Sequence, residues 1–158
     1  MTATATRSAG AAAKGGAGNA DVFVVFGITG DLAKVMTFRS LYRLERRGLI
    51  DCPIVGVAVD DWTVDQLRDR AKESIVGTGE QLDEEIFDRL ASRFSYVSGD
   101  FSDDATYKRV ADAISGFEQP VFYLEIPPFL FGRVVGGLAK AGPPTASWCS
   151  GSRATWRR

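Results

Sequence analysis

The feature that most constrains the fold is an apolar run that ends in a pair of glycines. Val22–Phe26 is a continuous stretch of β-branched and aromatic residues, which is typical of a strand buried on both faces. Gly27 and Gly30 follow at once, and apolar residues then recur at helical spacing as far as Leu44. A buried strand, a glycine turn and an amphipathic helix in this order predict the first unit of a parallel α/β sheet.

The same alternation continues along the chain. We predict further strands at 54–59, 94–98 and 120–124, with helices beginning near Thr63, Asp83, either Ser102 or Asp103, and Phe129. Buried strands separated by helices predict an α/β fold with a Rossmann-like, doubly wound parallel sheet. The first helix is expected to bury one apolar face, formed by Leu32, Val35, Phe38, Leu41 and Leu44.

Two segments differ in composition from the predicted domain at 21–142. Residues 1–20 are almost entirely Ala, Gly, Thr and Ser, so we expect a disordered tail. Residues 143–158 begin with two prolines and contain three arginines and no acid. We expect an aberrant or disordered tail there, translated from a shifted reading frame or ending by chance, so that the sheet is incomplete at the C-terminus. A natural basic tail is the alternative.

Composition excludes several classes of function. The 19 Lys and Arg against 20 Asp and Glu leave no basic excess, so we expect no nucleic-acid partner. Apolar stretches are far shorter than the roughly 20 residues that span a bilayer, so we expect no membrane partner. With 2 cysteines and no secretory pattern, a cytoplasmic location is the expectation. The 158 residues contain no histidine, which excludes a histidine base or zinc ligand here, and we predict no metal site and no catalytic residue.

The glycine turn is a candidate phosphate-binding site. A glycine after a buried strand lets the backbone turn tightly, and the N–H groups of the next helical turn then face the ligand. Thr29 can add a hydroxyl donor, and Asp31 is expected to cap the helix from the side. The spacing has one glycine fewer than the dinucleotide fingerprint, so a turn that binds no ligand is an equal alternative.

The end of the second strand bears on the choice of coenzyme. An acid at this place in a Rossmann-like fold can accept a hydrogen bond from a ribose 2′-hydroxyl and repels a 2′-phosphate. Asp60 and Asp61 follow Val59 here, which favours NAD over NADP. The alternative is that one of these acids only caps the helix that follows.

Several of these segments together resemble a known family. The motifs are G-I-T-G-D-L-A at 27–33, I-V-G-V-A at 54–58, D-W at 61–62, Y-V-S-G-D at 96–100 and F-Y-L-E-I-P-P at 122–128. They are similar to the N-terminal coenzyme domain of glucose-6-phosphate dehydrogenase, especially its actinobacterial branch. The resemblance runs from about residue 21 to 142.

The resemblance implies oxidation of glucose 6-phosphate at C1 with NADP, the entry step of the pentose phosphate pathway. It places the coenzyme diphosphate among Gly27, Ile28, Thr29, Gly30, Asp31, Leu32, Ala33 and Lys34. It also places Tyr123, Glu125, Ile126 and Pro127 near the crevice between adenosine and nicotinamide. From the residues alone, Tyr123 is predicted to pack rather than to stack on a coenzyme ring, and the alternative for Glu125 is a carboxylate bonded to neighbouring backbone amides.

The chain departs from the family pattern at two positions and lacks two motifs. Val59 stands where the family commonly has an arginine that holds the 2′-phosphate, and Met36 where it has a lysine near the substrate. The Glu-Lys-Pro strand and the segment with the histidine base are not among these residues, nor is the domain through which the family forms homo-oligomers. We therefore expect no turnover by these 158 residues alone. A non-catalytic NAD-binding module or pseudo-enzyme, and an interaction fragment without a ligand, are the alternatives.

Overall fold

The computed structural model describes residues 20–142 and 147–149. Within them, parallel strands form one sheet in the order β3-β2-β1-β4-β5. The strands are β1 (Val22–Phe26), β2 (Ile54–Ala58), β3 (Phe94–Ser98), β4 (Pro120–Leu124) and β5 (Ser147–Cys149). The order reverses between β1 and β4, which is the topological switch point of a doubly wound sheet. The predicted Rossmann-like α/β fold is confirmed.

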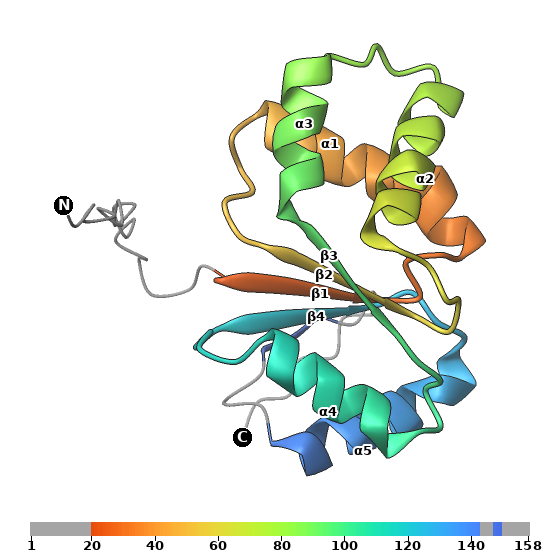
Figure 1. The fold of residues 1–158 in the computed structure, drawn as a ribbon, viewed down its shortest axis with the longest axis vertical. Coiled ribbons are helices and arrows are strands. Elements are labelled where there is room, and N and C mark those ends of the chain that lie inside the picture. Colours follow the sequence, from red (N-terminus) through yellow and green to blue (C-terminus); the bar gives the residue numbers. More distant parts are fainter. Residues whose placement is uncertain (1–19, 143–146, 150–158) are drawn as a thin grey trace, which may run out of the picture.

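Helices cover both faces of this sheet (Figure 1). One face carries what we call the α1–α3 layer: α1 (Phe38–Arg46), α2 (Val64–Gly77) and α3 (Glu84–Arg93). The other carries the α4–α5 layer: α4 (Asp104–Ala113) and α5 (Phe131–Ala141). Two short segments, η1 (Ala33–Thr37) and the 3₁₀ turn η2 (Pro128–Leu130), lead into α1 and α5.

Local sequence signals set the helix boundaries. Thr63 caps α2 in a reciprocal capping box with Gln66, and the side chains of Asp83 and Asp103 accept from the first N–H groups of α3 and α4. The predicted helix starts are therefore confirmed. Because Thr63 is the cap of α2, the alternative that Asp60 or Asp61 caps this helix is wrong.

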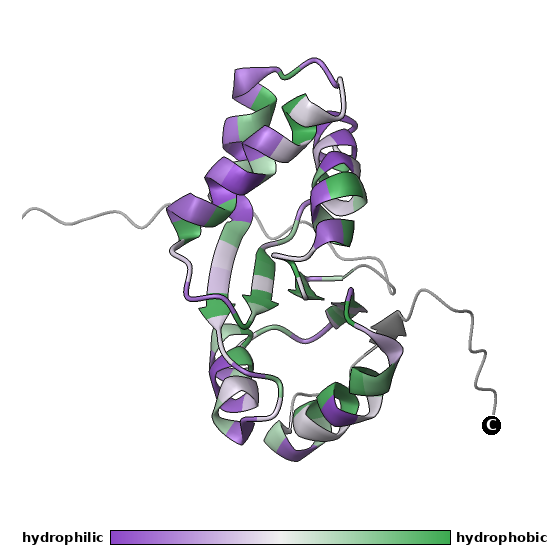
Figure 2. Ribbon diagram, turned by 90° about the vertical axis from the view of Figure 1, so that its right-hand side faces the viewer, coloured by the Kyte–Doolittle hydropathy of each residue, from purple (hydrophilic) through white to green (hydrophobic). Residues whose placement is uncertain are grey.

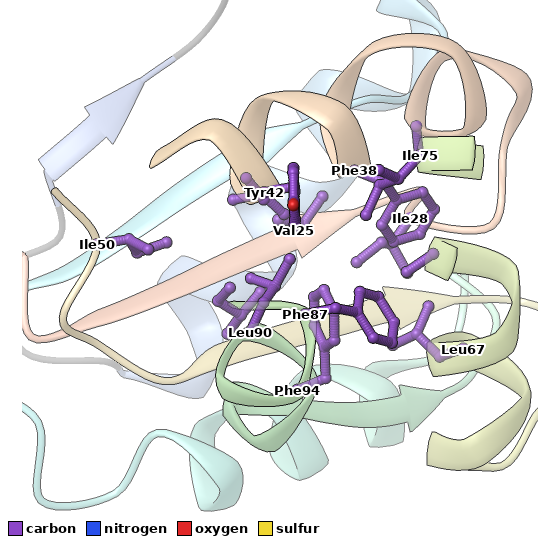
Figure 3. Close-up of a cluster of buried hydrophobic side chains, with 14 of the residues drawn as sticks. Val25, Ile28, Phe38, Tyr42, Ile50, Leu67, Ile75, Phe87, Leu90 and Phe94 are labelled. Carbon is purple, nitrogen blue, oxygen red and sulfur yellow. The ribbon is translucent and has the colours of Figure 1, made fainter. Parts of the chain in front are cut away.

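Each face of the sheet has its own core. The larger core lies under α1, α2 and α3 and is shown in Figure 3, where Ile28, Phe38 and Leu67 converge. The smaller core lies under α4 and α5. Figure 2 shows hydrophobic residues along most of the strands, and helices in which hydrophobic and hydrophilic residues alternate. Strands buried from both sides explain the continuous apolar runs in the sequence.

The helix after the glycine turn differs from the prediction. In η1 the backbone is π-helical, and the Phe38 N–H donates to the Ala33 carbonyl five residues back. Because a π-helical turn contains more residues than an α-helical turn, the side chains before α1 point in other directions than an α-helix would give them. Leu32, Val35 and Leu44 are 50%, 60% and 38% exposed, so the predicted apolar face is wrong for these three residues, whereas Phe38 and Leu41 are buried as predicted.

The last strand was not predicted. Ser147–Cys149 pairs in parallel with β4, in a segment whose sequence has no apolar period. The predicted tails at 1–20 and 143–158 otherwise lie outside the described residues, apart from residue 20. The domain limits at 21 and 142 therefore stay predictions.

Candidate nucleotide-binding site

The glycine turn lies at the carboxyl edge of the sheet, at the end of β1. Gly27 has a φ of 85°, in the left-handed region that favours glycine. A Cβ on Gly27 would overlap the backbone carbonyl of Glu125, just beyond β4. The Gly27 N–H donates to the Val57 carbonyl at 2.7 Å, and the Gly30 N–H donates to the Gly27 carbonyl at 2.9 Å. The turn is therefore fixed against both strands beside β1, and only glycine fits at position 27.

The predicted residues after Gly27 divide into buried and exposed side chains. Ile28 and Ala33 are fully buried, so any contact they make with a ligand comes from the backbone. Asp31, Leu32 and Lys34 are exposed. The first N–H groups of a helix have no partner within it, so this helix start offers donors at the sheet edge. Within the described residues the Asp31 carboxylate has no hydrogen bond, so the prediction that it caps the helix is wrong.

Ile28 anchors the turn in the core. Its side chain fills the space that Gly56, in the middle of β2, leaves open, and a Cβ on Gly56 would lie 2.8 Å from the Ile28 Cγ2 atom. Leu67 of α2 packs at the same place, with its Cδ2 atom 3.3 Å from the position of that Cβ. The conformation of the turn is thus coupled to the packing of β2 and α2.

Asp60 is joined to the turn through a side-chain hydrogen bond. The Thr29 hydroxyl donates to the Asp60 carboxylate, so the predicted site residues Thr29 and Asp60 lie together. The Tyr96 hydroxyl donates to the Asp60 backbone carbonyl at 2.6 Å. Burial, followed by the charges of Asp60 and Asp61, raises the pKa of Tyr96 to about 12. Tyr96 therefore stays protonated at neutral pH and holds the Asp60 backbone in place.

Glu125 contacts the π-helical segment. The Thr37 hydroxyl donates to Oε1 of Glu125, while Oε2 is buried and has no hydrogen-bond partner among the described residues. Burial raises the pKa of this carboxyl group, and the bond from Thr37 opposes the rise. The alternative that neighbouring backbone amides hold the carboxylate is wrong. Glu125 therefore has one buried carboxyl oxygen at the switch point that no described residue satisfies.

The other predicted residues beyond β4 lie on different surfaces. Tyr123 is half-buried, stacks on Phe23 with ring centroids 6.0 Å apart, and packs against the larger core. Its predicted packing role is confirmed. Ile126 is 8% exposed and belongs to the smaller core, whereas Pro127 is exposed.

A hollow of about 520 Å³ opens beside Pro127, on the α4–α5 side of the carboxyl edge. Segments that follow three strands line it: Val59, Asp100, Phe101, Ser102, Pro127, Phe129, Leu130 and Arg133. The N–H and hydroxyl of Ser102 both donate to the Asp100 carboxylate, and these bonds hold its pKa below the usual value. Sequence reasoning missed Asp100, Ser102 and Arg133 as site residues. The position of Asp100 and Ser102 just after the third strand was a signal that could have found them, whereas Arg133 lies in the first turn of α5.

The arrangement can bind an extended ligand across the carboxyl edge. The glycine turn offers N–H donors for an anion, the hollow offers apolar walls, and Glu125 offers an acceptor on the β4 side of the turn. No helix in the described part of the chain has the length and apolarity needed to cross a bilayer.

Comparison with protein families points to one family. The model described as "Glucose-6-phosphate dehydrogenase, NAD binding domain" matches residues 24–157. The chain is 54% identical over 125 residues to glucose-6-phosphate 1-dehydrogenase 1 of Mycobacterium tuberculosis, covering 79% of this chain and 27% of that protein. It is 34% identical over 127 residues to the glucose-6-phosphate 1-dehydrogenase of Hanseniaspora uvarum, covering 72% of this chain and 25% of that protein. The chain thus spans about a quarter of the length of these relatives.

Solved structures agree with this assignment. The crystal structure of glucose-6-phosphate 1-dehydrogenase from Mycobacterium avium superposes with a TM-score of 0.80 at 54% identity, covering 83% of this chain and 29% of that one. A glucose-6-phosphate dehydrogenase in complex with its substrate glucose 6-phosphate gives a TM-score of 0.70 at 25% identity, covering 82% of this chain and 29% of that one. The sequence resemblance noted above is confirmed, and the chain belongs to the glucose-6-phosphate dehydrogenase family.

Proposed function

We propose that this chain supplies the coenzyme-binding domain of a glucose-6-phosphate dehydrogenase, which oxidises C1 of glucose 6-phosphate with NADP. The observation that carries this proposal is Gly27, whose backbone has a φ of 85° and leaves no room for a Cβ beside the Glu125 carbonyl. Such a position, directly before a helix at the carboxyl edge of a parallel sheet, suits the close approach of a diphosphate. Membership of the family supports the same function.

Each predicted residue then has a role in holding the coenzyme. The backbone of Gly27, Ile28, Thr29, Gly30, Asp31, Leu32, Ala33 and Lys34 surrounds the diphosphate. Asp60 and the hollow lie on the adenosine side, since they follow β2 and its neighbour β3. Glu125, Ile126 and Pro127 border the β4 side of the crevice, and Tyr123 supports them by packing.

The coenzyme is a nicotinamide dinucleotide, which when bound accepts the hydride from the substrate. The residues of this chain bind and orient it. We assign NADP from the family. Val59 and the adjacent acids Asp60 and Asp61 favour NAD, and a non-catalytic NAD-binding module is the function that this one observation supports instead.

Proton removal from the C1 hydroxyl is assigned to regions of the longer relatives that this chain does not span. General base catalysis contributes roughly 10²–10⁴-fold, and the 158 residues contain no histidine. We therefore expect no turnover of glucose 6-phosphate by these residues alone. A cytoplasmic location is part of the proposal, and the buried free thiol of Cys52 supports a reducing environment.

Calorimetric titration of the 158-residue chain with NADP and with NAD tests coenzyme binding. We expect binding by the wild type and at least tenfold weaker binding by Gly27→Ala, because the new Cβ occupies the place of the Glu125 carbonyl. Gly48→Ala is the matched control: Gly48 also has a positive φ, of 65°, but has no atom within 4 Å of the added Cβ.

Two results would contradict the proposal. One is a wild type that binds neither dinucleotide while circular dichroism shows it folded, and the other is equal binding by the Gly27→Ala and Gly48→Ala variants. Steady-state formation of reduced coenzyme from glucose 6-phosphate by the purified chain would contradict the assignment of the base to other regions.

A further inference from the structure

The hollow beside Pro127 is lined by apolar side chains and by a few polar and charged ones. Its apolar walls are Val59, Phe101, Phe129 and Leu130, of which Val59 is 63% and Phe129 is 81% exposed. Such side chains at the adenosine end of a Rossmann-like crevice can cover the faces of a planar base. The hollow therefore has the shape and chemistry for the adenosine half of the ligand.

Two charged side chains line this hollow, and they differ in their partners. The Asp100 carboxylate already accepts from the Ser102 N–H at 2.6 Å and from its hydroxyl. Arg133 has no ion pair and no hydrogen bond from its side chain to any described residue, and it is exposed. Its charge helps to lower the pKa of the Asp100 carboxyl, so the two side chains lie near each other. Arg133 is the one cationic residue among those that line the hollow, and its hydrogen-bond donors have no partner among the described residues.

Arg133 belongs to the first turn of α5, the end at which a helix dipole is positive. A guanidinium presents paired donors that match the oxygens of a phosphate. Across the hollow, the end of β2 offers only the neutral Val59, followed by Asp60 and Asp61. A cation that binds a phosphate here must therefore come from α5 rather than from β2.

We propose that Arg133 binds the 2′-phosphate of NADP and so selects NADP over NAD in this chain. The proposal rests on the coenzyme-binding function proposed above. The acids Asp60, Asp61 and Asp100 oppose a dianion at this place, and Arg133 offsets them. Selection of the phosphorylated coenzyme thus depends on a residue of α5.

Adenosine nucleotides without nicotinamide test this subsite directly. The probes are 2′,5′-ADP, which carries the 2′-phosphate, and 5′-AMP, which lacks it, followed by NADP and NAD, all titrated calorimetrically into the 158-residue chain. Arg133→Gln is compared with Lys140→Gln, an exposed residue at the other end of α5. Thermal unfolding followed by circular dichroism checks that each variant is folded.

We expect Arg133→Gln to weaken binding of 2′,5′-ADP and NADP by about tenfold or more, because a charge-assisted hydrogen bond is lost. Binding of 5′-AMP and NAD should change less than twofold, and Lys140→Gln should match the wild type. Arg133→Lys should recover part of the binding, since it restores the charge without the paired donors.

Equal weakening of 2′,5′-ADP and 5′-AMP, or no weakening of either, overturns the role of Arg133 and leaves coenzyme binding intact. A folded wild type that binds none of the four nucleotides overturns the proposed function together with this inference. The two failures are therefore distinguishable.

Discussion

The two helical layers of the molecule use charged residues differently. Among the described residues, every ion pair lies in the α1–α3 layer or in the segments beside it. The Glu80 carboxylate forms ion pairs with Arg39, Arg43 and Arg46 of α1. The buried Glu45 carboxylate forms ion pairs with Arg89 and Arg93 of α3. The α4–α5 layer has no ion pair within the same described residues, although it contains lysines, arginines and acids.

Packing takes the place of charge in the α4–α5 layer. Gly137 of α5 lies against the ring of Tyr107 of α4, and the Tyr107 hydroxyl donates to the Phe101 carbonyl at 2.6 Å. The α1–α3 layer thus pairs its charged side chains with one another. In the other layer, charged side chains such as Arg133 form no ion pair with any described residue.

The largest effect should come from filling the contact between α4 and α5. In Gly137→Ala the added Cβ would overlap the Tyr107 ring, which is only 2% exposed and cannot move aside. We expect a loss of about 2–3 kcal/mol in the free energy of unfolding, measured with urea. Gly136→Ala on the same helix meets no atom within 4 Å and should stabilise by about 0.5–1 kcal/mol. If both variants changed the free energy of unfolding in the same direction, the contact between Gly137 and Tyr107 would not be what stabilises this layer.

A smaller effect should follow from removing the buried charge in the opposite layer. The Glu45 side chain is 4% exposed, and its Oε2 accepts from Arg93 Nε at 2.8 Å. Glu45→Gln should cost about 1–2 kcal/mol of unfolding free energy, since the two arginines can still reach water. Glu84→Gln, which breaks the exposed pair with Lys72, should cost less than about 0.5 kcal/mol. Equal costs for the two variants would remove the distinction between buried and exposed pairs.

The smallest effect concerns Glu125, which lies between the layers, and it depends on pH. Burial raises the pKa of its carboxyl above the usual 4.5, so the folded protein binds this proton more tightly than the unfolded chain does. The charged form therefore costs stability above the raised pKa, and this cost disappears as the pH falls to about 4.5. Glu125→Gln should be more stable than the wild type at pH 7, with an advantage that shrinks over this range.

Thr37→Val sharpens the same measurement. Without the hydroxyl that donates to Glu125, the pKa of this carboxyl should rise further, and the pH dependence of unfolding should move to higher pH. A stability difference between Glu125→Gln and the wild type that is the same at pH 4 and pH 7 would contradict the role of burial.

The strands and helix starts could be predicted because their signals are local. The predicted strands at 94–98 and 120–124 coincide with β3 and β4, and the caps Thr63 and Asp83 begin α2 and α3. The glycine turn was predicted for the same reason. A buried run followed by glycine needs no knowledge of distant residues.

The features that the sequence did not reveal depend on contacts between distant segments. Thr37, in the π-helical segment, bonds to Glu125, 88 residues away, so periodicity within one helix could not show it. The hollow is assembled from segments after β2, β3 and β4, and Arg133 joins it only once α5 is packed. Strand β5 is only three residues long and has no strand pattern in its sequence. It is a strand because it pairs with β4, which the sequence could not show.

The packing of Ile28 into the space left by Gly56 has a thermodynamic consequence for ligand association. The turn cannot open unless β2 and α2 unpack, so its amide groups hold one arrangement before any ligand arrives. A preorganised loop loses little conformational entropy on association, and the smaller entropy loss makes the free energy of binding more favourable. The contact between Ile28 and Gly56 thus affects the proposed binding of the diphosphate, although the Ile28 side chain does not touch the ligand.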